Sequence, residues 1–192
     1  MTTRTLWTYA DYAALPDDGK RYEIHDGELC ELTGPNTRHQ IVSANLSDVL
    51  RAHVKSRRIG IVLYAPLDVI LSDRPTETTV LQPDLIYIDP SRQSVLKMRG
   101  VEGAPTLVVE IFSPRTMAVD RGRKRGLYAR YGVPYLWFVD PIGRYIEALV
   151  LAAGDYSVAA RMSGERPVDL PPFTDLGLVP DSLWPDESLF TE

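Results

Sequence analysis

Two acidic residues, Asp84 and Glu110, lie in apolar segments where an unpaired charge is costly. Glu110 interrupts the nearly continuous apolar run TLVVEIF (residues 106–112), and Asp84 opens the apolar segment DLIYID (residues 84–89). A buried carboxylate must be hydrogen-bonded, ion-paired or bound to a metal. If these segments form neighbouring strands, the two carboxylates converge, and a divalent cation would remove their repulsion. Because Mg²⁺ binds one or two carboxylates together with water and a substrate phosphate, the pair predicts a Mg²⁺ (or Mn²⁺) site for phosphodiester hydrolysis.

The segment after Glu110 adds a lysine and an aspartate to this site. At 100° per residue, one helical stripe contains Asp120, Lys124, Leu127, Tyr128 and Tyr131. The apolar and aromatic members indicate that this stripe faces the sheet, so Lys124 points inward, where lysine is rare unless paired. We therefore predict that Lys124 orients the attacking water and stabilises charge on the phosphoryl group. Asp120 would orient Lys124.

Structural interpretations of the same residues remain open at this point. Asp120 and Lys124 have the i, i+4 spacing of a helix salt bridge, which contributes only about 0.2–0.5 kcal/mol. Glu110 could pair with an arginine, and Asp84 could end a strand or take part in a turn. Since structural ion pairs also bury charge, the catalytic interpretation depends on the three residues meeting at one place.

The remaining pattern predicts a single α/β (α+β mixed) domain of residues 1–192, with a central mixed sheet flanked by helices. Its core covers about residues 9–160, and a proline-rich irregular tail covers about 163–192. Asp26-Gly27 between two apolar runs predicts an N-terminal hairpin with a type I′ turn. Expected helices cover about 8–14, 37–58 and 117–131, with Thr8 as one N-cap and a capping box at Thr37 and Gln40. Expected strands cover about 61–71 (or a pair interrupted at Pro66), 84–89, 106–112, 135–140, 144–151 and a segment near Tyr156.

Three further residues are candidates for supporting roles. Glu23 alternates with Tyr22 and Ile24 in the hairpin, so it faces either the site or solvent. His39 lies in the first turn of the long helix, where a surface position is the simpler interpretation. Asp68 lies in a strand pattern and either supports the site from behind or belongs to a bulge or turn.

Arginines crowd the helix that carries Lys124. Arg115, Arg121, Arg123 and Arg125 would form a basic rim beside the acidic pocket, as binding to a phosphate backbone requires. Solvation and salt bridging are the alternative for several of them. A second basic stripe, Arg51, Lys55 and Arg58, is typical of a solvated helix face, and cations near a helix C-terminus also suit the helix dipole.

The composition excludes several classes of protein. The hydrophobic fraction is 44%, the charged fraction is 24% and the formal net charge is -5, so any nucleic-acid contact must rely on local positive charge. No apolar run is long enough for a membrane span, and the N-terminus lacks the pattern of a signal peptide. The single cysteine, Cys30, excludes an intrachain disulfide and fits a cytoplasmic location. Neither a serine-hydrolase triad nor a glycine-rich phosphate loop is visible.

The combined motifs resemble the Uma-two family of restriction-endonuclease-like proteins, which belongs to the PD-(D/E)xK nuclease superfamily. The resemblance covers about residues 9–146 and includes Gln82-Pro83-Asp84, VVEIFSPRT (residues 108–116), YARYGVP (residues 128–134) and FVDP (residues 138–141).

The resemblance implies a restriction-endonuclease-like fold and DNA as the substrate. It implies Asp84, Glu110 and the backbone carbonyl of Ile111 as metal ligands, with Glu23 aiding metal binding. The superfamily lysine lies two residues after the glutamate, where this chain has Phe112; related proteins carry the lysine on the next helix, as Lys124 would. Tyr135 replaces a glutamate of the family pattern. Nucleases of this superfamily often pair, so a homodimer is also expected.

The sequence thus predicts a Mg²⁺- or Mn²⁺-dependent endonuclease that hydrolyses DNA through Asp84, Glu110 and Lys124. Two alternatives stay open because of Phe112 and the overall acidity. One is a nucleic-acid-binding protein on the same fold with little or no catalysis. The other is a homo-oligomeric interaction protein whose acidic pocket is a structural ion-pair network.

Overall fold

Two mixed six-stranded sheets organise the chain in a computed structural model that describes residues 6–190. The first, here called the hairpin sheet, has the strand order β2-β1-β5-β4-β8-β7. Its strands are β1 (Arg21–His25), β2 (Glu28–Leu32), β4 (Val69–Ser72), β5 (Thr79–Leu81), β7 (Leu96–Lys97) and β8 (Gly100–Glu102). The second, here called the core sheet, has the order β12-β11-β10-β9-β6-β3. Its strands are β3 (Ile61–Tyr64), β6 (Leu85–Ile88), β9 (Leu107–Ile111), β10 (Tyr135–Asp140), β11 (Tyr145–Ala152) and β12 (Asp155–Met162).

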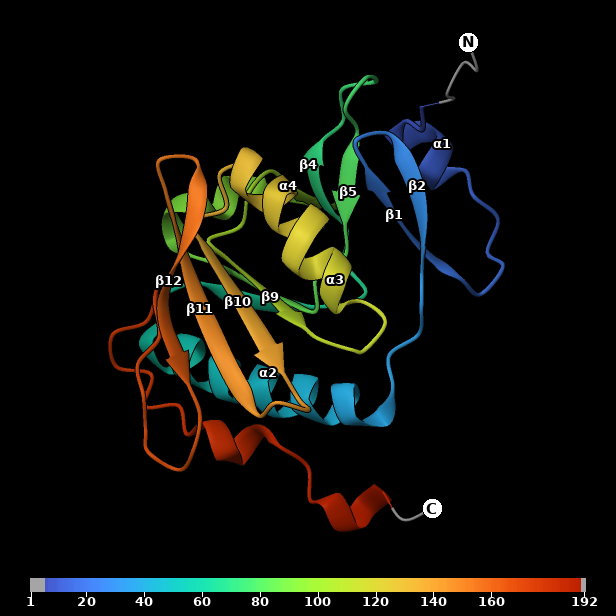
Figure 1. Ribbon diagram of the computed structural model, residues 1–192. Coiled ribbons are helices and arrows are strands. Elements are labelled where there is room, and N and C mark those ends of the chain that lie inside the picture. Colours follow the sequence, from blue (N-terminus) through green and yellow to red (C-terminus); the bar gives the residue numbers. More distant parts are fainter. Residues whose placement is uncertain (1–5, 191–192) are drawn as a thin grey trace.

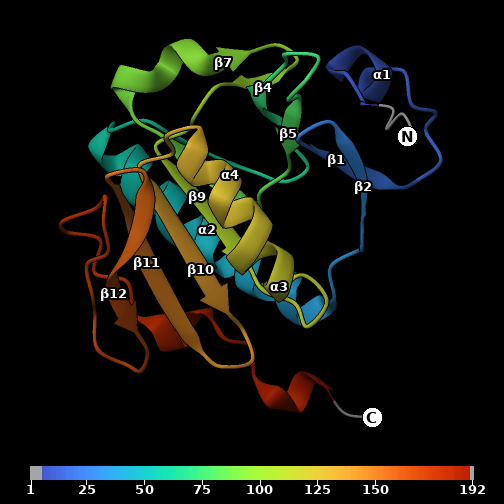
Figure 2. The ribbon, with the colours of Figure 1, turned by 45° about the horizontal axis from the view of Figure 1, so that its top comes forward.

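Helices cover both faces of the core sheet (Figures 1 and 2). The α-helices are α1 (Tyr9–Ala13), α2 (Thr37–Arg57), α3 (Met117–Val119) and α4 (Arg125–Arg130), and a π-helical turn (Asp120–Lys124) joins α3 to α4. Short 3-10 helices cover Pro90–Val95, Pro180–Leu183 and Glu187–Phe190. None of the helices formed by residues 6–190 is long and apolar enough to cross a membrane.

The alternation of β9 divides the core between the two faces. Leu107, Val109 and Ile111 belong to the hydrophobic cluster that contains the α2 residues Val42 and Leu46. Val108 and Phe112 belong to the opposite cluster, together with Leu127 and Tyr128 of α4. Because successive strand residues point to opposite faces, Glu110 points toward α4.

The predicted mixed α/β fold with an N-terminal hairpin is confirmed. The hairpin turn has φ 51° at Asp26 and φ 76° at Gly27, as a type I′ turn requires. A Cβ on Gly27 would also lie 2.8 Å from the Leu6 side chain, so this position needs glycine for space as well as for conformation. Thr8 caps α1 with a complete capping box, as expected.

The structure corrects the prediction in three places. The strands form two sheets instead of the one central sheet that was predicted. The segment at 61–72 is a strand pair, and its halves, β3 and β4, belong to different sheets. Three strands of two or three residues, β5, β7 and β8, were missed because they are too short to show an alternating pattern. The N-cap of α2 is Asn36 instead of a capping box at Thr37, since the Asn36 side chain accepts the His39 N–H at 2.9 Å.

The C-terminal tail is irregular but not detached from the core. Leu178, Leu183 and Trp184 are buried in the cluster that contains α2. The Asn45 side chain of α2 donates to the Leu183 carbonyl at 3.0 Å. The tail therefore packs beside α2 and extends the hydrophobic cluster between α2 and the core sheet.

Candidate active site

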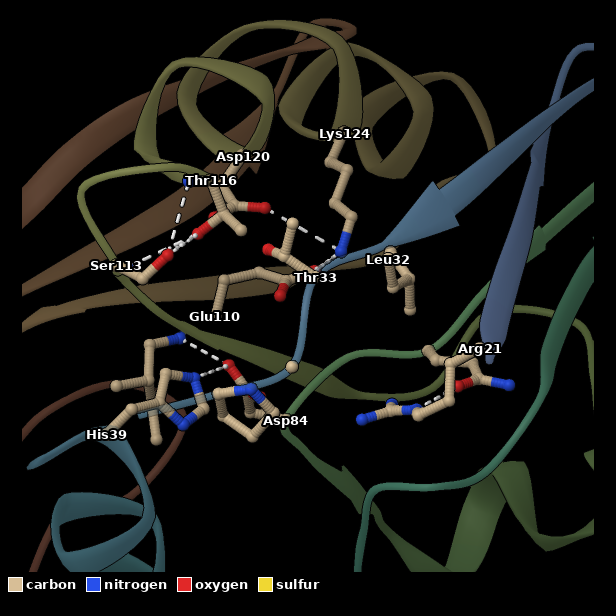
Figure 3. Close-up of a pocket in the computed structure, with 14 residues that line it drawn as sticks. Arg21, Leu32, Thr33, His39, Asp84, Glu110, Ser113, Thr116, Asp120 and Lys124 are labelled. Atoms are coloured by element: carbon tan, nitrogen blue, oxygen red, sulfur yellow. Dashed lines mark hydrogen bonds and ion pairs between the residues drawn. The ribbon is translucent and has the colours of Figure 1, made fainter. Parts of the chain in front are cut away.

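Asp84, just before the start of β6, and Glu110, near the end of the neighbouring strand β9, lie at the same end of these two strands of the core sheet. Strands β6 and β9 are antiparallel, with Leu85 opposite Val109. The next positions along the two strands, Asp84 and Glu110, therefore also lie opposite each other. Both side chains line a small cavity of about 60 Å³ (Figure 3). The convergence predicted from the sequence is confirmed.

Asp84 is held by the strand beside it and by the start of α2. Its Oδ2 accepts the Ile111 N–H at 2.7 Å and lies 3.2 Å from His39 Nε2. His39 is 9% exposed and faces the cavity, so the simpler interpretation of a surface histidine is wrong. Burial lowers the pKa of His39, but the Asp84 carboxylate and the Ile111 carbonyl outweigh it, and that pKa lies above its usual value.

Glu110 and Lys124 meet on the other side of the cavity. Lys124 Nζ lies 3.1 Å from Glu110 Oε1, which also accepts the Tyr128 hydroxyl at 2.6 Å. Glu110 is 3% exposed and Lys124 is 6% exposed. Lys124 thus reaches Glu110 from the helix, while Phe112, at the position where the resemblance would place a lysine, packs against Phe138 in the hydrophobic cluster.

The hairpin sheet contributes a second carboxylate to the same lysine. Glu23 is fully buried, and its Oε1 lies 2.9 Å from Lys124 Nζ while accepting the Gln82 N–H at 2.7 Å. Its other oxygen, Oε2, lies 2.8 Å from His25 Nε2. Of the two orientations left open by the hairpin alternation, Glu23 therefore takes the inward one. Lys124 therefore contacts one carboxylate from each sheet, Glu23 of β1 and Glu110 of β9.

A π-helical turn presents Asp120 and Lys124 together. Asp120 Oδ1 lies 3.6 Å from Lys124 Nζ, and Asp120 is 3% exposed. The predicted helix over about 117–131 is present, but its middle, Asp120–Lys124, is a π-helical turn instead of an α-helical one. A π-turn inserts one extra residue into a helix, and such turns occur frequently at functional sites.

Burial and mutual repulsion separate the protonation behaviour of the acids. Burial raises the pKa of Glu110 well above its usual value despite Lys124, and the neighbouring acids raise it further. Burial also raises the pKa of Asp120. Burial opposes ionisation of Glu23, but Lys124 and His25 outweigh it and lower the pKa of Glu23 to about 2. Burial alone would lower the pKa of Lys124, but the surrounding carboxylates raise it well above its usual value.

The donor set fits a hard divalent cation. Asp84 uses Oδ2 for both of its side-chain contacts and Glu110 uses Oε1, which leaves Oδ1 and Oε2 as possible ligands. Three carboxylates, from Glu23, Glu110 and Asp120, contact Lys124, and the carboxylate of Asp84 lies opposite them in the same cavity. The acids therefore outnumber Lys124 and Arg21, the lysine and arginine that line the cavity. Within residues 6–190, no three His, Cys, Asp or Glu side chains form a metal-binding group by themselves. A Mg²⁺ ion here would take its other ligands from the Ile111 carbonyl, water and substrate. Protein-bound Mg²⁺ commonly has one or two carboxylate ligands and completes its coordination with water and substrate phosphate.

Asp68 lies behind the cavity rather than in it. Its Oδ1 accepts hydrogen bonds from the Tyr12 hydroxyl at 2.8 Å and from the Gln82 side-chain amide at 2.9 Å. Since the Gln82 N–H holds Glu23, Asp68 supports the site through one intermediate residue.

The structure does not bring the four predicted DNA-binding arginines together. Arg115 and Arg123 line a hollow of about 250 Å³ between the hairpin and the π-turn. Arg121 pairs with Glu147 at 2.8 Å, and Arg125 pairs with Asp155 at 2.8 Å, both on the far strands of the core sheet. Arg123 also pairs with Glu28 at 2.8 Å. Their role in DNA binding stays a prediction. Of these four arginines, only Arg115 forms no salt bridge with the described residues.

Sequence reasoning missed Tyr128, His25 and Gln82 as parts of the site. Tyr128 was recognised on the inward stripe but not as the partner of Glu110, although a buried tyrosine hydroxyl requires an acceptor. His25 shares the face of β1 with Glu23 at a spacing of two residues, which was the available signal. Gln82 contacts Glu23 through its backbone N–H and Asp68 through its side chain, but in the sequence it stood out only as part of the Gln82-Pro83-Asp84 motif.

Comparisons with known proteins give the family from a sequence profile and the fold from a solved structure. The sequence profile of the Uma2 (Uma-two) family, described as "Putative restriction endonuclease", matches residues 9–183. A crystal structure described as "a putative nuclease belonging to DUF820", from Anabaena variabilis, superposes with a TM-score of 0.73 at 19% identity. The superposition covers 93% of this chain and 97% of that chain. At this identity the likeness shows the fold alone.

Two curated relatives match parts of the chain. The Synechocystis protein slr1290 is 28% identical over 110 residues, which are 57% of this chain and 55% of that protein. The ribosomal RNA small subunit methyltransferase J of Buchnera aphidicola is 42% identical over 55 residues, which are 28% of this chain and 22% of that enzyme. The chain thus spans about half of the first relative and about a fifth of the second, and neither match carries an activity to it.

Proposed function

The chain belongs to the Uma2 family, and from that premise we propose that it is a Mg²⁺- or Mn²⁺-dependent endonuclease that hydrolyses phosphodiester bonds in DNA. One observation carries the proposal. Asp84 and Glu110 stand opposite each other on adjacent strands, and the buried ammonium of Lys124 lies 3.1 Å from Glu110. Nuclease chemistry requires carboxylates for a metal ion and a cation for the phosphoryl charge, and both are present at one cavity.

We assign the ligand roles to Asp84, Glu110 and the Ile111 carbonyl. When bound, the metal ion would polarise the phosphoryl oxygen and lower the pKa of a bound water. His39 and the Ile111 N–H hold Asp84, and Tyr128 holds Glu110, so both carboxylates are fixed before substrate arrives. Such fixation avoids reorganisation during the reaction.

Lys124 acts as a fixed positive charge rather than as a base. Because its pKa is raised well above the usual value, the ammonium keeps its proton at neutral pH. It would donate to the attacking water or to a phosphoryl oxygen, while Glu23 and Asp120 hold it in place. Water adds to phosphorus and the bond from phosphorus to one deoxyribose oxygen breaks, leaving a phosphate on one end and a hydroxyl on the other. No covalent bond to the protein forms.

Plasmid nicking tests this function. We expect the wild-type protein to nick supercoiled DNA in Mg²⁺ or Mn²⁺ but not in EDTA, and Glu110→Gln to lose about 10²–10³-fold of that rate. The matched control is Glu165→Gln, at an exposed position outside the cavity, and it should cleave like the wild type. Equal nicking by wild type and Glu110→Gln would show that the activity arises elsewhere.

One observation favours a second candidate, a nucleic-acid-binding protein without hydrolysis. Lys124 already compensates Glu110 and Glu23, and a metal ion would have to share these carboxylates with it. Salt-dependent DNA binding without cleavage in either metal would support this candidate. The homodimer and the cytoplasmic location stay predictions, and light scattering would test the first.

A further inference from the structure

Three cations follow one another along the exposed side of α2. Arg51 and Lys55 have the spacing i, i+4, which places them on one face of α2, and Arg58, the C-cap, borders the same hollow. All three are exposed, and within residues 6–190 none of them forms a salt bridge. The guanidinium of Arg51 lies 5.9 Å from the ring centroid of Tyr64, which is 55% exposed.

These cations line a hollowed surface. A hollow of about 400 Å³ is bordered by Arg51, Lys55 and Arg58, together with β3. A second hollow of about 310 Å³ is bordered by Ser43, Ser47, Arg51 and Tyr64. Arg51 borders both, so the two hollows lie side by side along α2, and we call them together the α2 groove. Asp48 is the one acidic residue that borders it among the described residues.

The α2 groove begins beside the candidate active site. Ala65 borders its near end and donates its N–H to the Asp84 carbonyl at 3.0 Å. Gln40, also at the near end, directly follows His39, which contacts Asp84. At a rise of about 1.5 Å per residue, Arg51 lies about 18 Å and Arg58 about 28 Å along the helix from His39. Figure 1 shows α2 lying along the core sheet, with its N-terminal end nearest α3.

We propose that the α2 groove binds the phosphate backbone of the DNA substrate, several nucleotides away from the bond that is cut. The inference rests on the proposed function for the identity of the polymer. Charge carries it: a phosphate backbone requires cations that are not already neutralised. Arg51, Lys55 and Arg58 meet this requirement, and an exposed ring beside them is a common feature of surfaces that bind nucleic-acid strands.

Stabilisation of the helix dipole explains only part of this arrangement. Cations in the last turn of a helix stabilise it, and Lys55 lies in the last turn of α2, with Arg58 as its C-cap. The effect falls off within that turn, so it gives no reason for Arg51, which lies almost two turns earlier. Nor does it explain the hollow that Arg51 shares with Tyr64.

Equilibrium binding of DNA in EDTA tests the proposal without interference from cleavage. The test variant combines Arg51→Gln, Lys55→Gln and Arg58→Gln. The control combines Lys97→Gln, Arg161→Gln and Arg166→Gln, which removes the same charge from exposed positions outside the groove. These cations also form no salt bridge among the described residues, and Arg161, like Arg51, lies over a tyrosine ring. The dissociation constant for a labelled 20-base-pair duplex is measured from 50 to 200 mM NaCl for wild type and both variants.

We expect the test variant to bind about tenfold more weakly or worse, and its salt slope to fall by about 2–3, since each lost phosphate contact removes about 0.9. The control should keep the wild-type slope. Equal loss of affinity in both variants would show that only net charge matters and would overturn the proposal. Equal binding by the test variant and the wild type would also overturn it, and so would the absence of binding by the wild type. Salt-dependent binding through the groove without cleavage would instead overturn the proposed hydrolysis and leave the groove intact.

Discussion

The two helical regions that flank the core sheet both carry many basic side chains, but they use them differently. On the α3–α4 side, Arg121, Arg123, Arg125 and Arg130 each form a salt bridge, and Lys124 is buried among three acids. On the α2 side, Arg38 and Arg57 have acidic partners. The three cations of the α2 groove, Arg51, Lys55 and Arg58, form no salt bridge within the described residues. The density of basic residues in a sequence therefore does not locate a binding surface, because neighbouring acids decide which cations remain available.

The largest expected effect follows from Lys124→Met. This change leaves Glu23, Glu110 and Asp120 buried without their shared cation, and breaking such a buried pair costs about 3–5 kcal/mol of unfolding free energy. Urea unfolding checks this cost, and cleavage should fall to background. The control is Arg125→Met on the same helical segment, which loses a partly exposed pair with Asp155 and a hydrogen bond to the Tyr156 carbonyl and should cost about 1–2 kcal/mol.

Because Lys124→Met could reduce activity through unfolding, Lys124→Arg separates the two roles. It keeps the charge but changes the geometry, so we expect a folded protein with reduced cleavage. Equal stability of Lys124→Met and Arg125→Met would remove the distinction between buried and exposed cations on this side of the sheet.

An intermediate effect is expected from His39→Gln at the start of α2. His39 contacts Asp84, and loss of a residue that orients a metal ligand typically lowers metal affinity or activity about 10–100-fold. Calorimetric titration with Mn²⁺ measures the affinity. His53→Gln is the matched control, because His53 is buried on the same helix but lies beside Phe173, away from the cavity. Unchanged Mn²⁺ affinity in His39→Gln would show that His39 is not needed to orient Asp84 as a metal ligand.

A smaller effect is expected from the double variant Arg121→Gln, Arg125→Gln. Both arginines already have acidic partners on the far strands, so DNA affinity should change by less than about threefold, while each lost pair lowers stability by about 1 kcal/mol or less. Binding and urea unfolding are measured in parallel with the α2 groove variant. A loss of DNA affinity as large as that of the groove variant would reverse the comparison between the two helical regions.

The smallest effect concerns Arg38, which, like Arg57, is an arginine of α2 with an acidic partner. Hydrogen bonds from Arg38 and Arg144 lower the pKa of Glu187 from 4.5 to about 2. A lowered carboxyl pKa stabilises the fold above the unfolded value, and the contribution is lost as pH falls from about 4.5 through about 2. The Tm difference between wild type and Glu187→Gln should therefore be present at pH 7 and vanish near pH 2. A difference that persists at low pH would contradict the assigned ion pair.

The sequence predicted the parts of the site that interrupt an apolar pattern. Asp84 and Glu110 stood out because charge inside an apolar strand is costly, and Lys124 because it lies on an inward stripe. The long helix α2 and the hairpin were predicted because each has a strong periodicity and a clear turn signal. These features depend on residues close together in the chain.

What the sequence could not show depends on residues far apart in it. The meeting of Glu23 with Lys124 requires the hairpin sheet to dock on the π-turn, across 101 positions of the chain. The π-turn breaks the uniform 100° period on which the helix prediction relied. Arg121 and Arg125 were predicted as DNA contacts because arginines crowd their helix. Their acidic partners, Glu147 and Asp155, come from later strands, so the sequence did not show that these arginines are paired.

The most direct test of the central claim is an anomalous-scattering map from a crystal soaked in Mn²⁺. The account predicts one peak between the Asp84 and Glu110 carboxylates, within about 2.0–2.4 Å of an oxygen from each and of the Ile111 carbonyl oxygen. The peak should disappear in Glu110→Gln and persist in Glu165→Gln. A map without a peak there, at Mn²⁺ concentrations that support cleavage, would contradict the proposed metal site.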